Sequence, residues 1–439
     1  MPTSRLLKGV AAATVALLLP LTACSSGGGA ATSGGGSAAS TGTLTVWHYE
    51  SDESAMSKAW NKAIEIFKTE HPGVEVKVEK QVFEQIQKNA KIVLAGDSVP
   101  DVMEFNKGNA TAGVLASEEL ISPLTEEATK RGWDTKLASS LQVTAKYTDQ
   151  GLMGSGEWYG VPNYGEYVTV YYNQELFDKY KLKVPTTQAE FTAVMDAFVA
   201  EGVTPLAAAG AEYPMQQIWY QLALANANRD FVNSYQLFSS DVDFHGPEMT
   251  AGADTLNTWV KKGYFSKNAA GLKAEDMGVS FINGKYPMMI SGSWWFGRVK
   301  TEAKFDWSTF LFPGNKLNTG SSGNLWVVPE AAKNKALAYD FIDITLRPEV
   351  QNVLGENGGL PVAGDASTIT DPQTKKFTED FSAVVAADGL AFYPDWPVAG
   401  YYDVLVSGFQ SLINQTKSPN EVLDFIATPY EKGKKELKG

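Results

Sequence analysis

The chain has 439 residues and a formal net charge of −13, with 50 acidic residues against 37 basic ones. Such a charge disfavours binding to nucleic acid or to anionic lipid, because both are negatively charged themselves. A chain of this length is too long for one hydrophobic core, so we expect two lobes or domains.

The first 24 residues have the pattern of a secretory leader. Arg5 and Lys8 are followed by an apolar run, residues 9–21, that is shorter than the roughly 20 residues needed to cross a bilayer. The run leads into Leu-Thr-Ala-Cys24, which is typical of a lipobox, and Cys24 is the only cysteine of the chain. Because a lone cysteine cannot form an internal disulfide, we expect Cys24 to be lipidated, as by palmitate, after removal of residues 1–23 as a signal peptide.

Residues 24–42 are almost entirely Ser, Gly, Ala and Thr after the cysteine. Such a composition cannot bury a core, and it predicts a flexible tether. No later segment offers 18 unbroken apolar residues, so we expect the lipid to be the only contact with the membrane. The long Ala- and Gly-rich start favours a high-GC Gram-positive source, with the protein anchored on the extracytoplasmic face of the cell membrane.

The first part of the body alternates between expected strands and helices. In chain order we predict a strand at 44–47, a helix from about 51 to 70, a strand at 74–78, a helix at 83–94 and a strand at 102–105. This order is typical of a parallel sheet with helices on both faces. Ligands of such sheets bind beyond the carboxyl ends of the strands, where residues 48–50 and 106–109 follow.

A second α/β unit begins near residue 160. We predict, in chain order, a strand at 168–172, a short helical turn at 173–180, a helix at 188–200, mostly helix over 214–276, a strand at 287–291 and a helix at 333–345. The last 50 residues look helical apart from residues 391–400, where prolines interrupt the pattern. We find no internal repeat.

Several segments occur in an order that resembles one known family. They are Leu44–Trp47, His71–Val74, Gly96–Val102, Tyr159–Pro162, Tyr171–Phe177, Pro185–Thr187, Phe281–Lys285, Pro348–Gln351 and Gly359–Val362. Each segment alone is a weak signal, but the ordered set covers nearly the whole body and stands behind a lipobox. The chain resembles the extracellular sugar-binding lipoproteins of bacterial ABC importers, the group that includes the maltose-binding protein.

The resemblance implies an α/β, two-lobe periplasmic-binding-protein-like fold. Each lobe would hold a mainly parallel sheet flanked by helices, and the chain would cross a hinge three times, near residues 162–167, 313–323 and 359–361. Lobe 1 would comprise 43–164 with 322–360, and lobe 2 would comprise 165–321 with 361–439.

The resemblance also implies a function without catalysis. A monomer would capture a sugar between its lobes, close over it and present it to the membrane subunits of an ABC importer. No cofactor and no metal are expected. Within sugars, a short neutral oligosaccharide is favoured, with a lean toward α-galactosides or isomalto-sugars, while xylo- and malto-oligosaccharides stay open.

Sugar recognition needs polar groups for the hydroxyls, which are costly to bury unpaired. The polar candidates are His48, Glu50, Lys58, Asn106, Asn109, Gly323, Asn324 and Asp395. Gly323 is included because a glycine would let backbone amides approach a hydroxyl. Competing interpretations are a structural role for His48, a solvated charge for Lys58, and a turn acid or helix cap for Asp395.

Sugar recognition also needs flat aromatic faces that cover the apolar face of a pyranose ring. The aromatic candidates are Tyr167, Trp219, Trp294, Trp295 and Trp396. Packing in the core is an equally good interpretation for Trp219. One member of the pair Trp294 and Trp295 is expected at the ligand, and the sequence does not distinguish which.

Two other functions remain as alternatives. A glycoside-active enzyme would need two carboxylates at a set separation, and Glu50 and Asp395 could be nominated, but no catalytic motif supports it. A binding protein for a non-sugar solute, such as a polyamine or another small polar molecule, is the second. Anionic solutes are disfavoured because the chain has few arginines, Arg229 and Arg298 among them.

Overall fold

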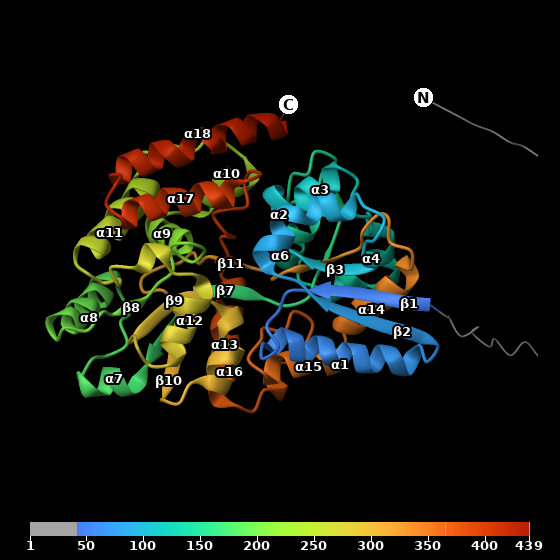
Figure 1. Cartoon of the computed structure of the whole chain (residues 1–439), viewed down its shortest axis with the longest axis horizontal. Coiled ribbons are helices and arrows are strands. Elements are labelled where there is room, and N and C mark those ends of the chain that lie inside the picture. Colours follow the sequence, from blue (N-terminus) through green and yellow to red (C-terminus); the bar gives the residue numbers. More distant parts are fainter. Residues whose placement is uncertain (1–41, 365, 439) are drawn as a thin grey trace, which may run out of the picture. The chain divides into compact units, whose positions relative to one another are not determined.

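A computed structural model describes residues 42–364 and 366–438. The predicted signal peptide, Cys24 and nearly all of the predicted tether lie outside these residues. The described chain is built around two sheets of five strands each, and helices flank both sheets (Figure 1). We call the first sheet with its helices lobe 1 and the second sheet with its helices lobe 2.

The sheet of lobe 1 has the strand order β2-β1-β3-β12-β6. The elements that open this lobe are β1 (Gly42–His48), α1 (Ala55–Glu70), β2 (Val74–Lys80), α2 (Phe83–Leu94) and β3 (Val102–Phe105). β1 pairs in parallel with both β2 and β3, as the sequence predicts. The two crossover helices thereby lie against the sheet, and the strand ends after β1 and β3 meet at one edge.

Helix α1 illustrates how the sequence sets these elements. The Ser54 side chain accepts a hydrogen bond from the backbone N–H of Ser57, which satisfies a free donor of the first turn. Trp60, Ile64 and Phe67 recur at helical spacing and are buried against the sheet. The helix ends before Pro72, which follows the last residues of the apolar stripe.

The other two strands of lobe 1 run differently. β12 (Leu325–Val327) is antiparallel to β3 and to β6 (Val161–Pro162). The chain enters β12 directly from β11 of the other sheet. Because no βαβ crossover precedes β12, nothing requires it to run parallel to β3.

The sheet of lobe 2 departs from the mainly parallel arrangement expected from the resemblance. Its strands are β7 (Glu166–Asn173), β8 (Leu206–Ala207), β9 (Met288–Gly292), β10 (Trp307–Phe310) and β11 (Gly320–Ser321). β7 is antiparallel to β9, β10 and β11, and only β8 with β9 is parallel. The reason is that β7 arrives from lobe 1, so no crossover helix constrains it to run with its neighbours.

Further elements complete the described chain. In and beside lobe 1 these are α3 (Val114–Ser117), α4 (Thr125–Arg131), α5 (Trp133–Lys136), α6 (Ser139–Gln142), β4 (Lys146–Tyr147), β5 (Glu157–Trp158), α14 (Lys335–Thr345) and α15 (Pro348–Glu356). In lobe 2 they are α7 (Gln174–Lys179), α8 (Gln188–Ala200), α9 (Met215–Ala223), α10 (Arg229–Leu237), α11 (Pro247–Lys261), α12 (Ala274–Ile282), α13 (Phe296–Glu302), α16 (Pro372–Ala386), α17 (Tyr401–Ile413) and α18 (Pro419–Lys438).

The chain passes between the sheets at three places. It leaves lobe 1 between β6 and β7, and it returns between β11 and β12. After α15, which packs on α1, residue Leu360 bridges to Gly165, and the chain continues into α16. There Phe377 packs on Tyr167 of β7, with ring centroids 5.2 Å apart. The lobe boundaries drawn from the sequence stay a prediction.

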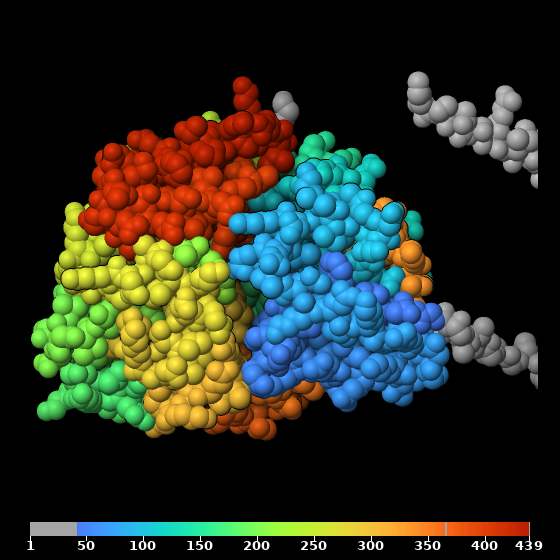
Figure 2. All heavy atoms as spheres, viewed as in Figure 1, coloured from blue at the N-terminus to red at the C-terminus, as the bar shows by residue number. Residues whose placement is uncertain are grey.

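The surfaces of the two lobes meet along a visible seam. Figure 2 shows residues of α1 and α2 (blue) against residues coloured yellow and red, which belong to the second half of the chain. Among the helices of residues 42–364 and 366–438, none combines the length and apolarity that a membrane span requires.

Candidate functional site

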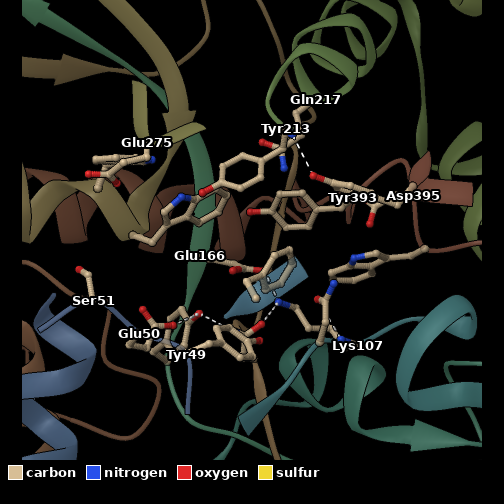
Figure 3. A pocket seen from close by; sticks show the side chains of 18 of the residues that line it. Tyr49, Glu50, Ser51, Lys107, Glu166, Tyr213, Gln217, Glu275, Tyr393 and Asp395 are labelled. Atoms are coloured by element: carbon tan, nitrogen blue, oxygen red, sulfur yellow. Dashed lines mark hydrogen bonds and ion pairs between the residues drawn. The ribbon is translucent and has the colours of Figure 1, made fainter. Parts of the chain in front are cut away.

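A cavity of about 260 Å³ is lined by residues from both lobes. Its lobe 1 side comes from the segments that follow β1 and β3, and its lobe 2 side comes from segments around α9, α12, α13 and α17 (Figure 3). Polar and charged side chains dominate the first side, and aromatic rings dominate the second. We refer to these two surfaces as the polar wall and the aromatic wall.

The polar wall follows from the parallel pairing of β1 with β3. Glu50 lies just beyond the end of β1, and Asn106 and Lys107 lie just beyond the end of β3. Because neighbouring parallel strands end at the same edge, these side chains converge. Asn324, which precedes β12, and Glu166, which begins β7, complete this wall.

A buried ion pair joins the two lobes at the polar wall. The Lys107 ammonium contacts the Glu166 carboxylate, and their side chains are only 2% and 5% exposed. Lys107 Nζ also donates to Asn324 Oδ1 at 3.1 Å, while Ser321 Oγ donates to Glu166 Oε1 at 2.7 Å. Burial lowers the pKa of Lys107, and the attraction of Glu166 opposes that effect.

Two more carboxyl groups lie in the same wall. Glu50 borders the cavity, and burial raises its pKa to about 7. Glu104, within β3, is fully buried behind it, and burial together with the charge of Glu50 raises its pKa well above the ordinary value. Tyr164 Oη donates to Glu50 Oε1 at 3.4 Å, and Asn324 Nδ2 donates to Glu104 Oε1 at 3.4 Å.

Another carboxylate faces the cavity from lobe 2. Asp395 lies in the non-helical segment between Pro394 and Pro397 and is 9% exposed. Burial raises its pKa to about 6. Its own backbone N–H donates to this carboxylate, and within the described residues no side chain does, so the carboxylate can accept a further hydrogen bond from a ligand.

The aromatic wall is a chain of rings in contact. Tyr213 meets Trp294 edge-on with ring centroids 5.6 Å apart, Trp294 lies 6.1 Å from Tyr393, and Tyr393 lies 5.2 Å from Trp396. Tyr402 also lines this side of the cavity. Tilted and edge-on contacts at these distances are favourable, so the rings support one another as a platform.

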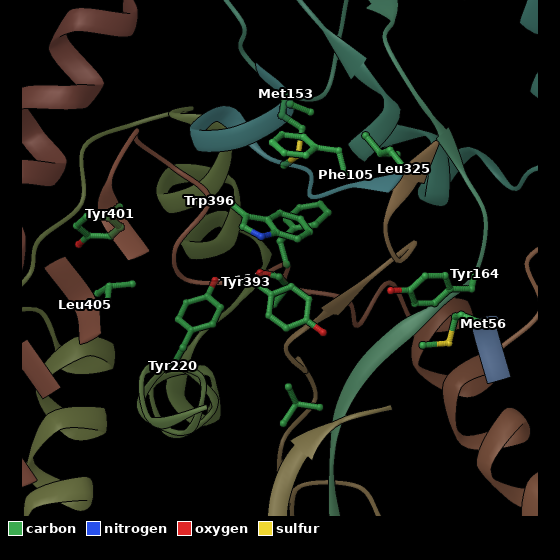
Figure 4. Close-up of a cluster of buried hydrophobic side chains, with 14 of the residues drawn as sticks. Met56, Phe105, Met153, Tyr164, Tyr220, Leu325, Tyr393, Trp396, Tyr401 and Leu405 are labelled. Atoms are coloured by element: carbon green, nitrogen blue, oxygen red, sulfur yellow. Dashed lines mark hydrogen bonds between the residues drawn. The ribbon is translucent and has the colours of Figure 1, made fainter. Parts of the chain in front are cut away.

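Trp396 is held between the cavity and the core. Its side chain packs over Gly108, where an added Cβ would lie 2.5 Å from that of Trp396. The backbone N–H of Ala110 donates to the carbonyl of Trp396 at 2.9 Å. Phe105 and Met153 belong with Trp396 to one cluster of buried hydrophobic side chains (Figure 4). A glycine at 108 is therefore required for the segment of Asp395 to reach the cavity.

The two cations of the cavity are both engaged by carboxylates. Lys107 is paired with Glu166, and Arg298 donates to both oxygens of Glu275 at 2.8 Å and to Glu302 at 2.8 Å. Acidic side chains therefore outnumber available basic ones at the surface of the cavity. An anionic ligand would meet repulsion from these acids and no uncommitted cation.

Several buried polar atoms at the cavity have no protein partner among the described residues. They include the phenol oxygens of Tyr49 and Tyr393 and the amide oxygen of Gln217. Buried polar groups are normally hydrogen-bonded, because leaving one unpaired costs about 1–3 kcal/mol. The cavity thus offers hydrogen-bonding groups to a polar ligand.

Seven of the residues predicted from the sequence line the cavity. They are Glu50, Asn106, Trp294, Trp295, Asn324, Asp395 and Trp396. Both members of the tryptophan pair reach the lining. Trp294 is in contact with the other rings of the aromatic wall, while Arg298 lies over the ring of Trp295 at 5.3 Å.

The other six predicted residues are not part of the lining, and three of them have roles in packing. Asn109 accepts a hydrogen bond from the backbone of Met153 at 2.7 Å and donates to the carbonyl of Pro397 at 3.1 Å. Tyr167 is fully buried and donates to the carbonyl of Phe377 at 3.2 Å. Trp219 is fully buried as well, packed at 4.7 Å on Phe409.

His48, Lys58 and Gly323 also lie away from the lining. Burial and the neighbouring Lys80 lower the pKa of His48 to about 4, so the ring is neutral at physiological pH. Lys58 lies 4.0 Å from Glu53 on the solvent side of α1. Gly323 has a φ of +71° and packs on the backbone of Tyr164, which leaves no room for a side chain.

Sequence reasoning missed part of the lining, notably Lys107, Tyr164, Glu166 and Tyr213. Lys107 could have been found, since it follows Asn106 at the same strand end. Tyr164 and Glu166 lie in the first crossing, which the resemblance already placed between the lobes. Tyr213 carries no sequence signal, because it precedes α9 and reaches the cavity only through the packing of lobe 2.

No cluster of three or more His, Cys, Asp or Glu side chains suited to a metal occurs within residues 42–364 and 366–438.

Comparison with known proteins agrees with this architecture. The model of the bacterial extracellular solute-binding protein family matches residues 62–383. The "multiple sugar-binding protein" of Streptococcus mutans is 27% identical over 325 residues, which cover 72% of this chain and 74% of that protein. A "probable sugar-binding periplasmic protein" of Rhizobium meliloti is 25% identical over 323 residues, covering 70% and 75% respectively.

Solved structures share the fold. A chitin oligosaccharide binding protein superposes with a TM-score of 0.75 at 21% identity, covering 90% of this chain and 99% of that one. A solute-binding protein in complex with raffinose has a TM-score of 0.72 at 21% identity, covering 89% and 99%. The two-lobe fold expected from the resemblance is confirmed.

Proposed function

The chain belongs to the family of bacterial extracellular solute-binding proteins, and from this premise we propose that it captures a short neutral oligosaccharide and delivers it to an ABC importer. The family is one of binding proteins, which agrees with the expectation that the chain is not an enzyme. The proposed ligand occupies the cavity between the lobes, with one sugar face on the aromatic wall and its hydroxyls on the polar wall.

The observation that carries this proposal is the opposition of the two walls. Rings of Tyr213, Trp294 and Tyr393 form an apolar platform, and Glu50 and Asp395 offer acceptors across from or beside it. A pyranose has this same division, with apolar C–H faces and a polar rim. The free polar atoms of the wall would be satisfied by several hydroxyls, as a sugar supplies.

The charge of the cavity supports a neutral ligand. Lys107 and Arg298 are engaged by carboxylates, so neither is available to neutralise a phosphate or a uronate. Names of similar proteins support a sugar: relatives in Streptococcus and Rhizobium are described as sugar-binding. The structure solved with raffinose supports the lean toward α-galactosides or isomalto-sugars. Other solved structures with this fold include one with bound maltose and one described in connection with xylan utilisation. Malto- and xylo-oligosaccharides are therefore included in the test.

We further propose that Cys24 is acylated and that the protein acts as a monomer, held on the extracytoplasmic face of a Gram-positive membrane by its lipid. The lipobox-like sequence before Cys24 supports this part of the proposal. Expression with a labelled fatty acid tests it. The label should appear on the wild-type protein and be absent from Cys24→Ser, whereas equal labelling of both would contradict lipidation at this residue.

Calorimetric titration of the purified protein against a panel tests the ligand. The panel holds raffinose, melibiose, isomaltose, xylobiose, maltotriose, free monosaccharides, a polyamine and a sugar phosphate. We expect one neutral oligosaccharide series to bind with a Kd of about 1 μM, or about −8 kcal/mol, and to be recovered intact. Binding of the polyamine or the sugar phosphate alone would contradict a neutral sugar, and cleavage of the titrant would point to an enzyme.

A further inference from the structure

Two buried glutamines hold the segments in which the chain crosses between the lobes. Gln351 belongs to α15, which packs on α1 of lobe 1, and Gln221 belongs to α9 of lobe 2. Both side chains are fully buried. An amide at such depth must find hydrogen-bond partners inside the protein, and these two find most of theirs in the crossings.

The side chain of Gln351 joins the first crossing to the third. Its Nε2 donates to the carbonyl of Asn163 at 2.9 Å, shortly before β7 begins, and to the carbonyl of Thr345 at 2.8 Å. Its Oε1 accepts from the backbone N–H of Val362 at 2.9 Å and from that of Ala363 at 3.3 Å. Both crossings are thereby held on lobe 1 at the place where they leave it.

The side chain of Gln221 holds the second crossing on lobe 2. Its Oε1 accepts from the backbone N–H of Thr319 at 2.9 Å, and its Nε2 donates to Asn318 Oδ1 at 3.2 Å. The backbone carbonyl of Gln221 accepts from Asn315 Nδ2 at 2.7 Å. These residues precede β11, from which the chain returns to lobe 1. The second crossing is therefore also held at the place where it leaves its lobe.

The residues just beyond these hydrogen bonds lie together. Tyr164 follows Asn163 in the first crossing, and Gly323 follows β11 in the second. Gly323 has a φ of +71° and packs directly on the backbone of Tyr164. The two crossings therefore have a common place at which they can bend, and Tyr164 also lines the cavity.

We propose that Gln351 and Gln221 fix the ends of the hinge, so that the lobes turn about the segments at Tyr164 and Gly323. The inference rests on the proposed function, since it concerns lobes that close on the same ligand. Neither glutamine is among the residues that line the cavity, so both are positioning residues. Gln351 and Val362 lie in two of the segments that carry the family resemblance, and their hydrogen bond gives these segments a shared role.

A hinge with fixed ends allows few arrangements of the lobes. Without the amide of Gln351, the carbonyl of Asn163 and the N–H of Val362 lose their partner, and both crossings can bend at further bonds. The ligand must then order a wider range of arrangements when it binds. The affinity for sugar should fall although no contact in the cavity has changed.

The distance between labels on the two lobes tests the proposal. Spin labels are attached to Ile92→Cys of α2 and Val199→Cys of α8, two exposed residues of different lobes (Figure 1), with the native cysteine removed by Cys24→Ser. We expect Gln351→Met and Gln221→Met each to broaden the distance distribution of the unliganded protein. Each should also lower the affinity for the best panel sugar by about tenfold.

Gln142 of α6 provides the matched control. Its Nε2 also donates to two backbone carbonyls, those of Asp134 and Leu137, each at 2.8 Å, but all three residues belong to lobe 1. Gln142→Met should leave the distance distribution and the affinity as in the wild type, even if it lowers the free energy of unfolding. A distribution for Gln351→Met that matches that of Gln142→Met would overturn the proposal.

Hydrogen exchange in the wild-type protein tests the same point without a variant that must fold. The N–H groups of Thr319, Val362 and Ala363 are bonded to the two glutamines, so they should exchange slowly and at the same rate with and without sugar. The N–H of Gly323 lies in the hinge itself and should exchange more slowly when sugar binds. Equal slowing of all four groups would place the glutamine contacts within the moving part and overturn the proposal.

The unliganded protein distinguishes this inference from the proposed function. If no panel sugar binds while Gln351→Met broadens the distance distribution, the proposed function fails and the role of the glutamines stands. If sugar binds and neither Gln351→Met nor Gln221→Met changes the distribution, the role of the glutamines fails and the proposed function stands.

Discussion

The two walls of the cavity are built by different means. The polar wall comes mainly from strand ends of lobe 1, where Glu50 and Asn106 follow neighbouring parallel strands, and Glu166 of lobe 2 completes it. The aromatic wall comes from segments before or between helices of lobe 2, such as Tyr213 before α9 and Tyr393 between α16 and α17. Backbone pairing fixes the first wall, and side-chain packing fixes the second.

This difference predicts two kinds of sensitivity. In the polar wall, buried charges balance one another, so removal of one partner should destabilise the folded protein. In the aromatic wall, rings that border the cavity should contribute mainly to binding.

Replacing Lys107 with Met should have the largest effect. The substitution leaves Glu166 buried without its counter-charge, which should lower the free energy of unfolding by about 3–5 kcal/mol. Denaturant unfolding measures this difference. The double variant Lys107→Met with Glu166→Gln is the matched control and should recover most of the loss. A single substitution that changes stability by less than about 1 kcal/mol would contradict a buried ion pair.

The raised pKa of Glu50 should make the stability of the folded protein depend on pH. Its pKa is raised in the folded protein, so the folded state binds more protons than the unfolded state between the ordinary value of 4.5 and about 7. The free energy of unfolding should therefore decrease as pH rises through this range, by about 3 kcal/mol for this group. Unfolding curves of the wild type and Glu50→Gln, compared across this range, isolate the contribution. A difference between the two proteins that does not change with pH would show that Glu50 titrates normally.

Removing a ring from the aromatic wall should weaken binding more than folding. Trp294→Ala should reduce the affinity for the best panel sugar by about 30-fold, or about 2 kcal/mol, as for a central contact residue. Phe425→Ala removes an exposed ring of α18 outside the cavity and should leave the affinity unchanged. Calorimetry compares the two. If both substitutions change the affinity equally, Trp294 does not contact the ligand.

Substitution of Asp395, the hydrogen-bond acceptor that lobe 2 contributes, should have a smaller effect on the affinity for sugar. Asp395→Asn replaces one carboxylate oxygen with a donor and should weaken sugar binding by about tenfold, or about 1.4 kcal/mol. Asp388→Asn is the control, because Asp388 is exposed and paired with Arg229 at 3.0 Å. If both variants bind as the wild type does, Asp395 does not contact the ligand.

The smallest effect is expected at a surface contact between the lobes. Lys88 of α2 lies 3.5 Å from Asp403 of α17, and their side chains are 61% and 65% exposed. Exposed ion pairs contribute little, so Asp403→Asn should change the free energy of unfolding by less than about 0.5 kcal/mol. A loss above about 1 kcal/mol would mean that this contact stabilises the arrangement of the lobes.

Much of lobe 1 could be predicted from the sequence because local signals agree there. The alternation around Val46 and Val76, the apolar stripe of α1 and the break at Pro72 each specify one element. If β1 and β3 are parallel neighbours, they end at the same edge of the sheet, which predicts Glu50 and Asn106 as site residues. The direction of β7 could not be predicted this way, since a strand after a crossing carries no periodicity that encodes its direction.

The site itself was predictable only in part. Asn109 has the same signal as Asn106, a polar residue after a strand, yet its amide is engaged by Met153 and Pro397. Trp219 and Trp294 look alike in sequence, but one packs in the core and the other borders the cavity. Tertiary packing decides such cases, and no local pattern contains that information.

A crystal structure of the protein with its best panel sugar would show which residues hold the ligand. We predict a sugar ring against Trp294 or Tyr393, with hydroxyls on Glu50 and Asp395. A sugar bound outside the cavity, or one that contacts neither carboxyl group, would contradict the account.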